Sequence, residues 1–113
     1  MSKLSKKSRK LSMIENVRYT DQFILDVSQV VRYISHVLDN TNAAQRLITS
    51  IEKAIENRTS NPEGFEPVHT CKVRQYLYYR IYIKHFTLYY IVIDGTMELR
   101  RFISSRRDYS KLL

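Results

Sequence analysis

Residues 76–113, with the sequence YLYYRIYIKHFTLYYIVIDGTMELRRFISSRRDYSKLL, change side-chain character with a period of two from Tyr78 onward. Such alternation predicts β-strands. The pair Asp94-Gly95 lies between two apolar runs and is typical of a hairpin turn. We expect three strands here: one from Tyr78, one from Phe86 to Ile93 after a tight turn near Lys84-His85, and one from Met97 to Ile103. The last third of the chain therefore predicts a small, mainly antiparallel sheet.

The first of these strands has two different faces. We expect one face to pack on helices and the other to carry cations and phenols: Tyr79, Ile81 and Ile83 against Tyr78, Arg80, Tyr82 and Lys84. Arginine binds phosphate through two parallel hydrogen bonds and tyrosine stacks on bases, so this second face suits a nucleic acid. Tyrosine is also favoured in any sheet, so an ordinary sheet without this role is an equal alternative.

Two helices are predicted before the sheet. Apolar residues recur at steps of three and four on both sides of the turn residues 39–42, and Thr20 or Asp21 can cap the first helix. Neither helix is long enough to be stable alone, so both apolar stripes need a partner surface. The expected buried residues are Phe23, Val27, Val30, Val31, Ile34, Val37 and Leu38 in the first helix, and Ala44, Leu47, Ile48, Ile51, Ala54 and Ile55 in the second.

These elements predict an α+β fold in which a helical hairpin packs on the sheet. A short strand over residues 15–19 precedes the hairpin, residues 61–75 form a loop, and a short helix runs from Ser104 or Ser105 to Leu113. The predicted order is strand, helix, helix, three strands, helix. A length of 113 residues has room for a single core, so we expect one domain over residues 15–113.

The charge of the chain is concentrated at its start. Five basic residues precede the first acid, Glu15, whereas residues 15–113 carry 14 basic and 11 acidic residues. We interpret residues 1–14 as a basic, solvated arm, with a phosphate clamp as the alternative. The formal net charge of +8 favours polyanionic or strongly acidic partners.

Several classes of protein are disfavoured by the composition. No stretch is apolar and long enough for a membrane span or a secretory signal, so we expect a cytoplasmic protein without membrane contact. Cys71 is the single cysteine, which excludes an internal disulfide and a multi-cysteine zinc site, and no motif supports a thiol enzyme. We expect no cofactor or metal, and structural or surface roles for the histidines at positions 36, 69 and 85.

A cationic and phenolic surface is the candidate site. Arg80, Arg106 and Arg107 can reach one surface, joined by one of Arg100 and Arg101, with Tyr82 and Tyr109 nearby. Guanidinium groups can stabilise the charge that develops on phosphorus, so this inventory favours phosphate chemistry without a metal. General base catalysis is poorly served, because arginine stays protonated and tyrosine titrates near 10. Binding of an acidic partner protein is an equal alternative.

The order of the elements and several motifs resemble the RelE/ParE superfamily of bacterial type II toxins. The resemblance covers roughly residues 15–113 and rests on Asn42-Ala43-Ala44 with Leu47 and Ile51, on Asn61-Pro62-Glu63-Gly64, on Tyr78 to Tyr90, and on the closing RRDYSKLL of residues 106–113. The resemblance implies a toxin that a cognate antitoxin neutralises. RelE-like members cleave messenger RNA in the ribosomal A site by 2'-hydroxyl attack, whereas ParE-like members poison DNA gyrase and are not nucleases.

The RelE site transfers to this sequence only in part. Arg80 and Lys84 match the basic residues of the first long strand, Arg107 or Arg106 matches the arginine after the last strand, and Tyr109 is the candidate terminal tyrosine. An arginine of RelE falls on Thr87 here, and Ser104-Ser105 stand where other subgroups place a histidine.

The resulting prediction is a toxin that inhibits translation as a metal-independent, ribosome-dependent endoribonuclease. Its partners are an antitoxin, the ribosome and messenger RNA; the alternatives are a gyrase poison without nuclease activity and a plain RNA-binding module. The predicted catalytic residues are Arg80, Arg107 and Tyr109, and the predicted RNA-binding residues are Tyr82, Lys84 and Arg106.

Overall fold

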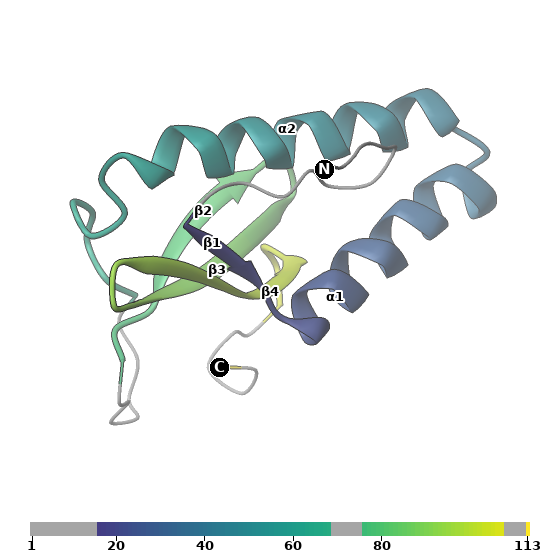
Figure 1. Ribbon diagram of the computed structural model, residues 1–113. Helices are drawn as coiled ribbons and strands as arrows, with labels where there is room; N and C mark the ends of the chain where they lie inside the picture. The colour runs from purple at the N-terminus through teal and green to yellow at the C-terminus, as the bar shows by residue number, and fades with distance from the viewer. Residues whose placement is uncertain (1–15, 69–75, 108–112) are drawn as a thin grey trace.

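A helical hairpin lies on one face of a four-stranded sheet in the computed structural model, which describes residues 16–68, 76–107 and 113 (Figure 1). The sheet has the order β1-β4-β3-β2. The elements are β1 (Val17–Tyr19), α1 (Asp21–Arg32), the π-helical turn η2 (Tyr33–Val37), α2 (Thr41–Thr59), β2 (Tyr79–Ile83), β3 (Phe86–Ile93) and β4 (Thr96–Ser104). The predicted α+β class and the helical hairpin are confirmed.

The three long strands form two antiparallel hairpins, as predicted, and β1 pairs with β4 in parallel. Asp94 and Gly95 have φ angles of 50° and 78°, the left-handed conformation that favours an Asp-Gly pair in a two-residue turn. Lys84, in the turn between β2 and β3, has a φ of 56°. The register of β3 and β4 shifts between Tyr89 and Tyr90, which gives β4 a local irregularity at Arg100.

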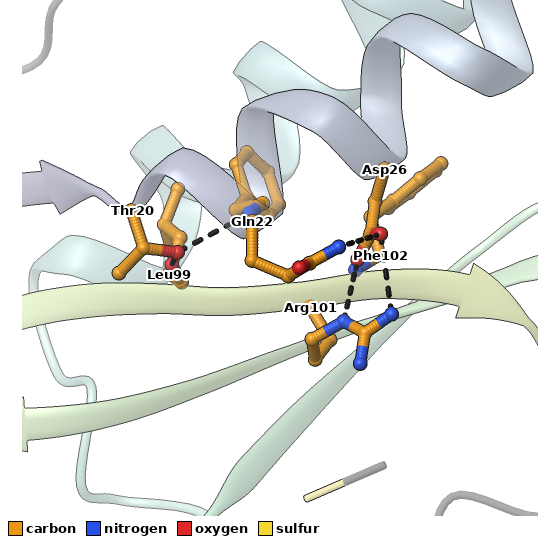
Figure 2. Close-up of polar contacts among 7 residues, drawn as sticks. Thr20, Gln22, Asp26, Leu99, Arg101 and Phe102 are labelled. Carbon is orange, nitrogen blue, oxygen red and sulfur yellow. Dashed lines mark hydrogen bonds and ion pairs between the residues drawn. The ribbon is translucent and has the colours of Figure 1, made fainter.

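Side-chain caps begin both helices. The Thr20 hydroxyl accepts a hydrogen bond from the Phe23 N–H at 3.2 Å and donates to the Leu99 carbonyl at 2.7 Å, so it joins the start of α1 to β4 (Figure 2). The Asn40 side chain accepts from the Ala43 N–H at 3.0 Å at the start of α2. These caps satisfy backbone donors that a helix leaves free in its first turn.

The main core lies between the hairpin and the sheet. The predicted stripe of α1 is only partly correct, because Phe23 and Val27 are buried whereas Val37 and Leu38 are exposed. The end of the hairpin at which the two helices join, which contains η2, projects past the sheet (Figure 1). The buried residues shared by helices and sheet are Val17, Phe23, Val27, Leu47, Ile51, Ile55, Tyr79, Ile81, Ile83, Leu88, Tyr90, Met97, Leu99 and Phe102.

A second apolar cluster covers part of the other sheet face. Val68 packs there with residues of β3 and β4 and with Tyr78, which directly precedes β2, and Leu113 contacts the same cluster. The Val68 N–H donates to the Tyr78 carbonyl at 2.7 Å, which attaches the end of the loop 61–68 to the residue before β2. The members of this cluster from the strands are Tyr89, Ile91 and Ile103. The predicted division of Tyr79, Ile81 and Ile83 from Tyr78 is therefore confirmed.

Three predictions fall on residues that the structure does not describe. The basic arm, residues 1–14, lies outside the described residues, as do positions 69–75 of the loop. The predicted terminal helix lies mostly within residues 108–112, which are also outside them; before it, residues 105–107 form a turn after β4.

Candidate functional site

The predicted site residues that can be placed come to one end of the sheet. Tyr82 of β2 pairs with Thr87 of β3, and Thr87 pairs in turn with Ile103 of β4. Phe86 pairs with Ser104, so the chain leaves β4 directly beside the turn between β2 and β3. We call this region, consisting of Arg80, Tyr82, Lys84, Arg106 and Arg107, the cationic end.

Arg80 and Tyr82 form one unit on the sheet face away from the helices. Arg80 Cζ lies 5.5 Å from the centroid of the Tyr82 ring, within the range of a cation–π contact. Tyr82 is 66% exposed although its cross-strand partner Thr87 is buried. An exposed ring below a guanidinium presents a stacking surface and a cation together.

The arginine pair is held by backbone contacts next to that unit. The Ser105 N–H donates to the His85 carbonyl at 3.0 Å, and the Arg107 N–H donates to the Ser104 carbonyl at 3.0 Å. Lys84, Arg106 and Arg107 are all exposed. The structure thus brings together five of the six predicted site residues, and the sixth, Tyr109, lies outside the described residues.

Arg100 and Arg101 take part in other contacts. Arg100 Nη1 binds Glu98 Oε2 at 3.0 Å, and its Cζ lies 5.8 Å from the centroid of the Tyr78 ring. Arg101 Nε binds Asp26 Oδ2 at 2.7 Å. The expected alternation of Arg100 and Arg101 across the sheet is wrong, because the register shifts at Arg100 and both flanking residues, Leu99 and Phe102, belong to the core under the helices. Each of the two arginines is bound to a carboxylate instead.

Asp26 is a buried carboxylate at the edge of the sheet (Figure 2). Besides Arg101 it accepts hydrogen bonds from the Phe102 N–H at 2.9 Å and from Gln22 Nε2 at 3.0 Å. Because β1 ends opposite Leu99, none of the described strands pairs with β4 at Phe102 on this side, and the carboxylate supplies the acceptor instead. Sequence reasoning missed this residue, although it lies between Phe23 and Val27 on the buried stripe of α1.

Arg58 is a second residue that the sequence did not indicate. Its Nη1 donates to the Tyr90 hydroxyl at 2.8 Å and to the Arg80 carbonyl at 3.3 Å. Its Cζ lies 3.6 Å from the centroid of the Phe65 ring, and the Tyr90 hydroxyl donates to the Pro62 carbonyl at 2.6 Å. Arg58 therefore connects α2, the loop 61–68 and the strand that carries Arg80.

Burial also changes the acidity of two phenols in this region. Burial raises the pKa of the Tyr90 hydroxyl, and the hydrogen bond from Arg58 opposes that shift without reversing it. Burial likewise raises the pKa of Tyr79, and the charge of Glu63 adds to the increase. The Tyr79 and Tyr90 rings stack at 5.4 Å, so both phenols belong to the interior and not to the cationic end.

The cationic end can bind phosphate and stack a base. It also contains one imidazole, because His85 lies exposed in the turn between β2 and β3. The predicted surface roles of His36 and His85 are confirmed by their exposure, whereas His69 lies outside the described residues.

A comparison of the sequence with models of known protein families gives a match over most of the chain. The sequence model described as "ParE toxin of type II toxin-antitoxin system, parDE" matches residues 17–109, which is most of the chain. The chain belongs to this family of ParE toxins. No curated protein matches it.

Membership of the ParE toxin family confirms the resemblance predicted from the sequence. The protein is the toxin of a type II toxin–antitoxin system, and such a system implies an antitoxin partner. Within the part of the chain that the structure describes, no helix has the length and apolar character needed to span a membrane.

Proposed function

We propose that this ParE-family toxin stops translation by cleaving messenger RNA on the ribosome, with the cationic end as its RNA-binding surface. The observation that carries the proposal is the exposed Tyr82 ring next to the Arg80 guanidinium, beside the turn that bears Arg106 and Arg107. A stacking ring surrounded by cations matches the needs of a single-stranded RNA whose bases are splayed out.

Each residue has a stated role in this proposal. Arg80 and Arg107 bind the scissile phosphate and stabilise the charge that develops on it, and Tyr109 stacks on a base or relays a proton. Tyr82 stacks on a neighbouring base, and Lys84 and Arg106 bind the flanking backbone. In this reaction the 2'-hydroxyl of the RNA attacks the adjacent phosphorus as the bond from phosphorus to the 5'-oxygen breaks, which leaves a 2',3'-cyclic phosphate and a 5'-hydroxyl end. The arginines, and not a metal, stabilise the charge on the phosphate, and the reaction takes place in the cytoplasm.

Two observations favour a second candidate, a gyrase poison without nuclease activity. The family model that matches residues 17–109 is that of ParE toxins, and the ParE-like members of the superfamily are its gyrase poisons. The second observation concerns the cations of the site. Thr87 stands where RelE has an arginine; its side chain is 1% exposed and its hydroxyl lies 2.8 Å from that of Ser105. Arg101, the nearest extra cation along β4, is bound to Asp26. The cationic end therefore offers fewer cations to a phosphate than the RelE site does, which a protein-binding inhibitor would tolerate.

Two assays with one protein preparation separate these candidates. The toxin is added to a reconstituted translation reaction and, in parallel, to a gyrase supercoiling reaction, each with and without equimolar antitoxin. The proposal predicts loss of amino-acid incorporation, prevented by antitoxin, and normal supercoiling. Normal incorporation with blocked supercoiling would replace the proposal with the gyrase poison, and the plain RNA-binding module predicts that neither reaction is inhibited.

A further inference from the structure

We propose that Thr87 is a positioning residue that acts through Ser105 to hold the Arg106-Arg107 turn in place at the cationic end. This inference rests on the proposed RNA-binding function of that end. Thr87 is the residue at which the chain departs from RelE. In this inference it supports the RNA-binding surface without contacting RNA.

The contact between the two hydroxyls joins a buried residue to an exposed one. Thr87 is 1% exposed in the middle strand, whereas Ser105 is exposed in the turn after β4. Their hydroxyl oxygens are 2.8 Å apart. A buried hydroxyl is costly to leave without a partner, so the Ser105 side chain is held inward by Thr87.

Backbone contacts fix the same turn from two other sides. The Ser105 N–H is bonded to the His85 carbonyl, and the Arg106 N–H donates to Ser104 Oγ at 3.3 Å. Thr87 thus completes a set of contacts around the residue that directly precedes the arginine pair. Long arginine side chains lose considerable rotamer freedom on binding, and a fixed backbone origin lowers that entropic cost.

Matched substitutions test this role. Thr87→Val keeps the shape of the side chain and removes the hydroxyl, Thr87→Ser restores a hydroxyl, and Ser105→Ala removes the partner at an exposed position where folding is not at risk. Thr96→Val is the control, because Thr96 begins β4 at the opposite end of the sheet, opposite Ile93. Each full-length variant is titrated against a fluorescent single-stranded RNA by anisotropy, and its thermal unfolding is recorded.

The inference predicts a specific pattern of affinities. Thr87→Val and Ser105→Ala weaken RNA binding about three- to tenfold, as expected for one lost hydrogen bond. Thr87→Ser and Thr96→Val bind as the wild type does. In the background of Arg106→Ala/Arg107→Ala, Thr87→Val has no further effect, because its action passes through those arginines.

Three outcomes would overturn the inference, and they differ in what else they affect. Wild-type affinity of Thr87→Val and Ser105→Ala, with weak binding by the double arginine variant, removes the role of Thr87 and leaves the RNA site standing. Wild-type affinity of the double arginine variant removes the RNA site at the cationic end together with the inference. A purely structural role of Thr87 would lower the unfolding temperature and add to the effect of the arginine substitutions, which also contradicts it.

Discussion

The side chain of Asp26 replaces a missing strand at the edge of the sheet. Its carboxylate binds the Arg101 guanidinium through two nitrogens, at 2.7 and 3.2 Å, and accepts the Phe102 N–H. A buried carboxylate is tolerated because its oxygens are paired, and the removal of its charge would break this buried ion pair.

Asp26→Asn should therefore destabilise the fold strongly. We expect a loss of about 3 kcal/mol in the free energy of unfolding, measured by urea denaturation at neutral pH. Asp21→Asn is the control, since Asp21 is exposed in the first turn of the same helix and contributes mainly through the helix dipole, worth under about 1 kcal/mol. Equal losses in the two variants would contradict the role of Asp26.

The buried phenol of Tyr90 predicts sensitivity to alkali. Its folded-state pKa is raised by burial, so the native state holds this proton more tightly than the unfolded chain does. The corresponding stability is fully present below the ordinary tyrosine pKa, near 10, and is lost as the pH rises through the folded pKa. The free energy of unfolding should fall above about pH 10.

Tyr90→Phe tests that assignment. It should reduce the slope of the alkaline loss, and at neutral pH it should cost about 1–3 kcal/mol through the lost bonds to Arg58 and Pro62. Tyr33→Phe, at a tyrosine that is 53% exposed, should change neither quantity. An unchanged alkaline slope in Tyr90→Phe would show that the proton is lost elsewhere.

The sequence predicted which side chains share a face of a strand better than it predicted which side chains contact one another. Arg80 and Tyr82 could be assigned to one face because strand periodicity fixes which side chains share it, whereas Lys84 lies in the turn after β2, with a φ of 56°, where that period no longer applies. The contact of Thr87 with Ser105 could not be predicted, because it depends on the register of two strands and on a turn outside them.

The elements follow the hydrophobic periods closely except at the tip of the hairpin. Periodicity indicates which side of a helix is apolar, but it does not indicate where the partner surface ends. The stripe of α1 continues into η2, which packs against α2 beyond the sheet, so Val37 is left 66% exposed.

The same valine-to-alanine substitution at Val27 and at Val37 compares the burial of the core with that of the hairpin tip. Val27→Ala should lower the free energy of unfolding by about 2 kcal/mol, because Val27 is buried in the core. Val37→Ala should change it by less than about 0.5 kcal/mol, as is usual for an exposed position. Similar losses in both variants, measured by urea denaturation, would show that the hairpin tip is covered in solution.

The turn between β2 and β3 holds a lysine in a backbone conformation that favours glycine. Lys84 has a φ of 56°, in the left-handed region that favours glycine. Lys84→Gly should leave the fold as stable or more stable, by up to about 1 kcal/mol, while it weakens binding of single-stranded RNA. A variant that is both less stable and unaltered in RNA binding would contradict the assignment of Lys84 to the site.

The cationic end lies away from the main core. The helices cover one face of the sheet (Figure 1), Tyr82 of the cationic end is exposed on β2, and Lys84, Arg106 and Arg107 lie in the turns that follow β2 and β4. Family membership and fold class could be predicted from the sequence because they depend on element order and short motifs, whereas the parallel pairing of β1 with β4 could not, because it joins segments far apart in the chain. The choice between ribosome and gyrase stays a prediction, because Thr87 departs from the RelE pattern.

Binding to the antitoxin shows whether a variant that has lost toxicity is still folded. Arg107 is exposed in a turn outside the helices and strands, so Arg107→Ala should leave the fold intact and reduce toxicity at least about tenfold through the lost phosphate contact. Growth arrest on expression and capture by the cognate antitoxin are measured together. Undiminished toxicity of a folded, antitoxin-binding variant would remove Arg107 from the site.

Primer extension on a defined messenger RNA tests whether the toxin cleaves the message on the ribosome. Purified toxin is added to a reconstituted translation reaction with and without ribosomes, beside the Arg107→Ala variant. We expect cuts within the A-site codon that require ribosomes and that disappear in the Arg107→Ala variant. An intact message with unimpaired translation would contradict it.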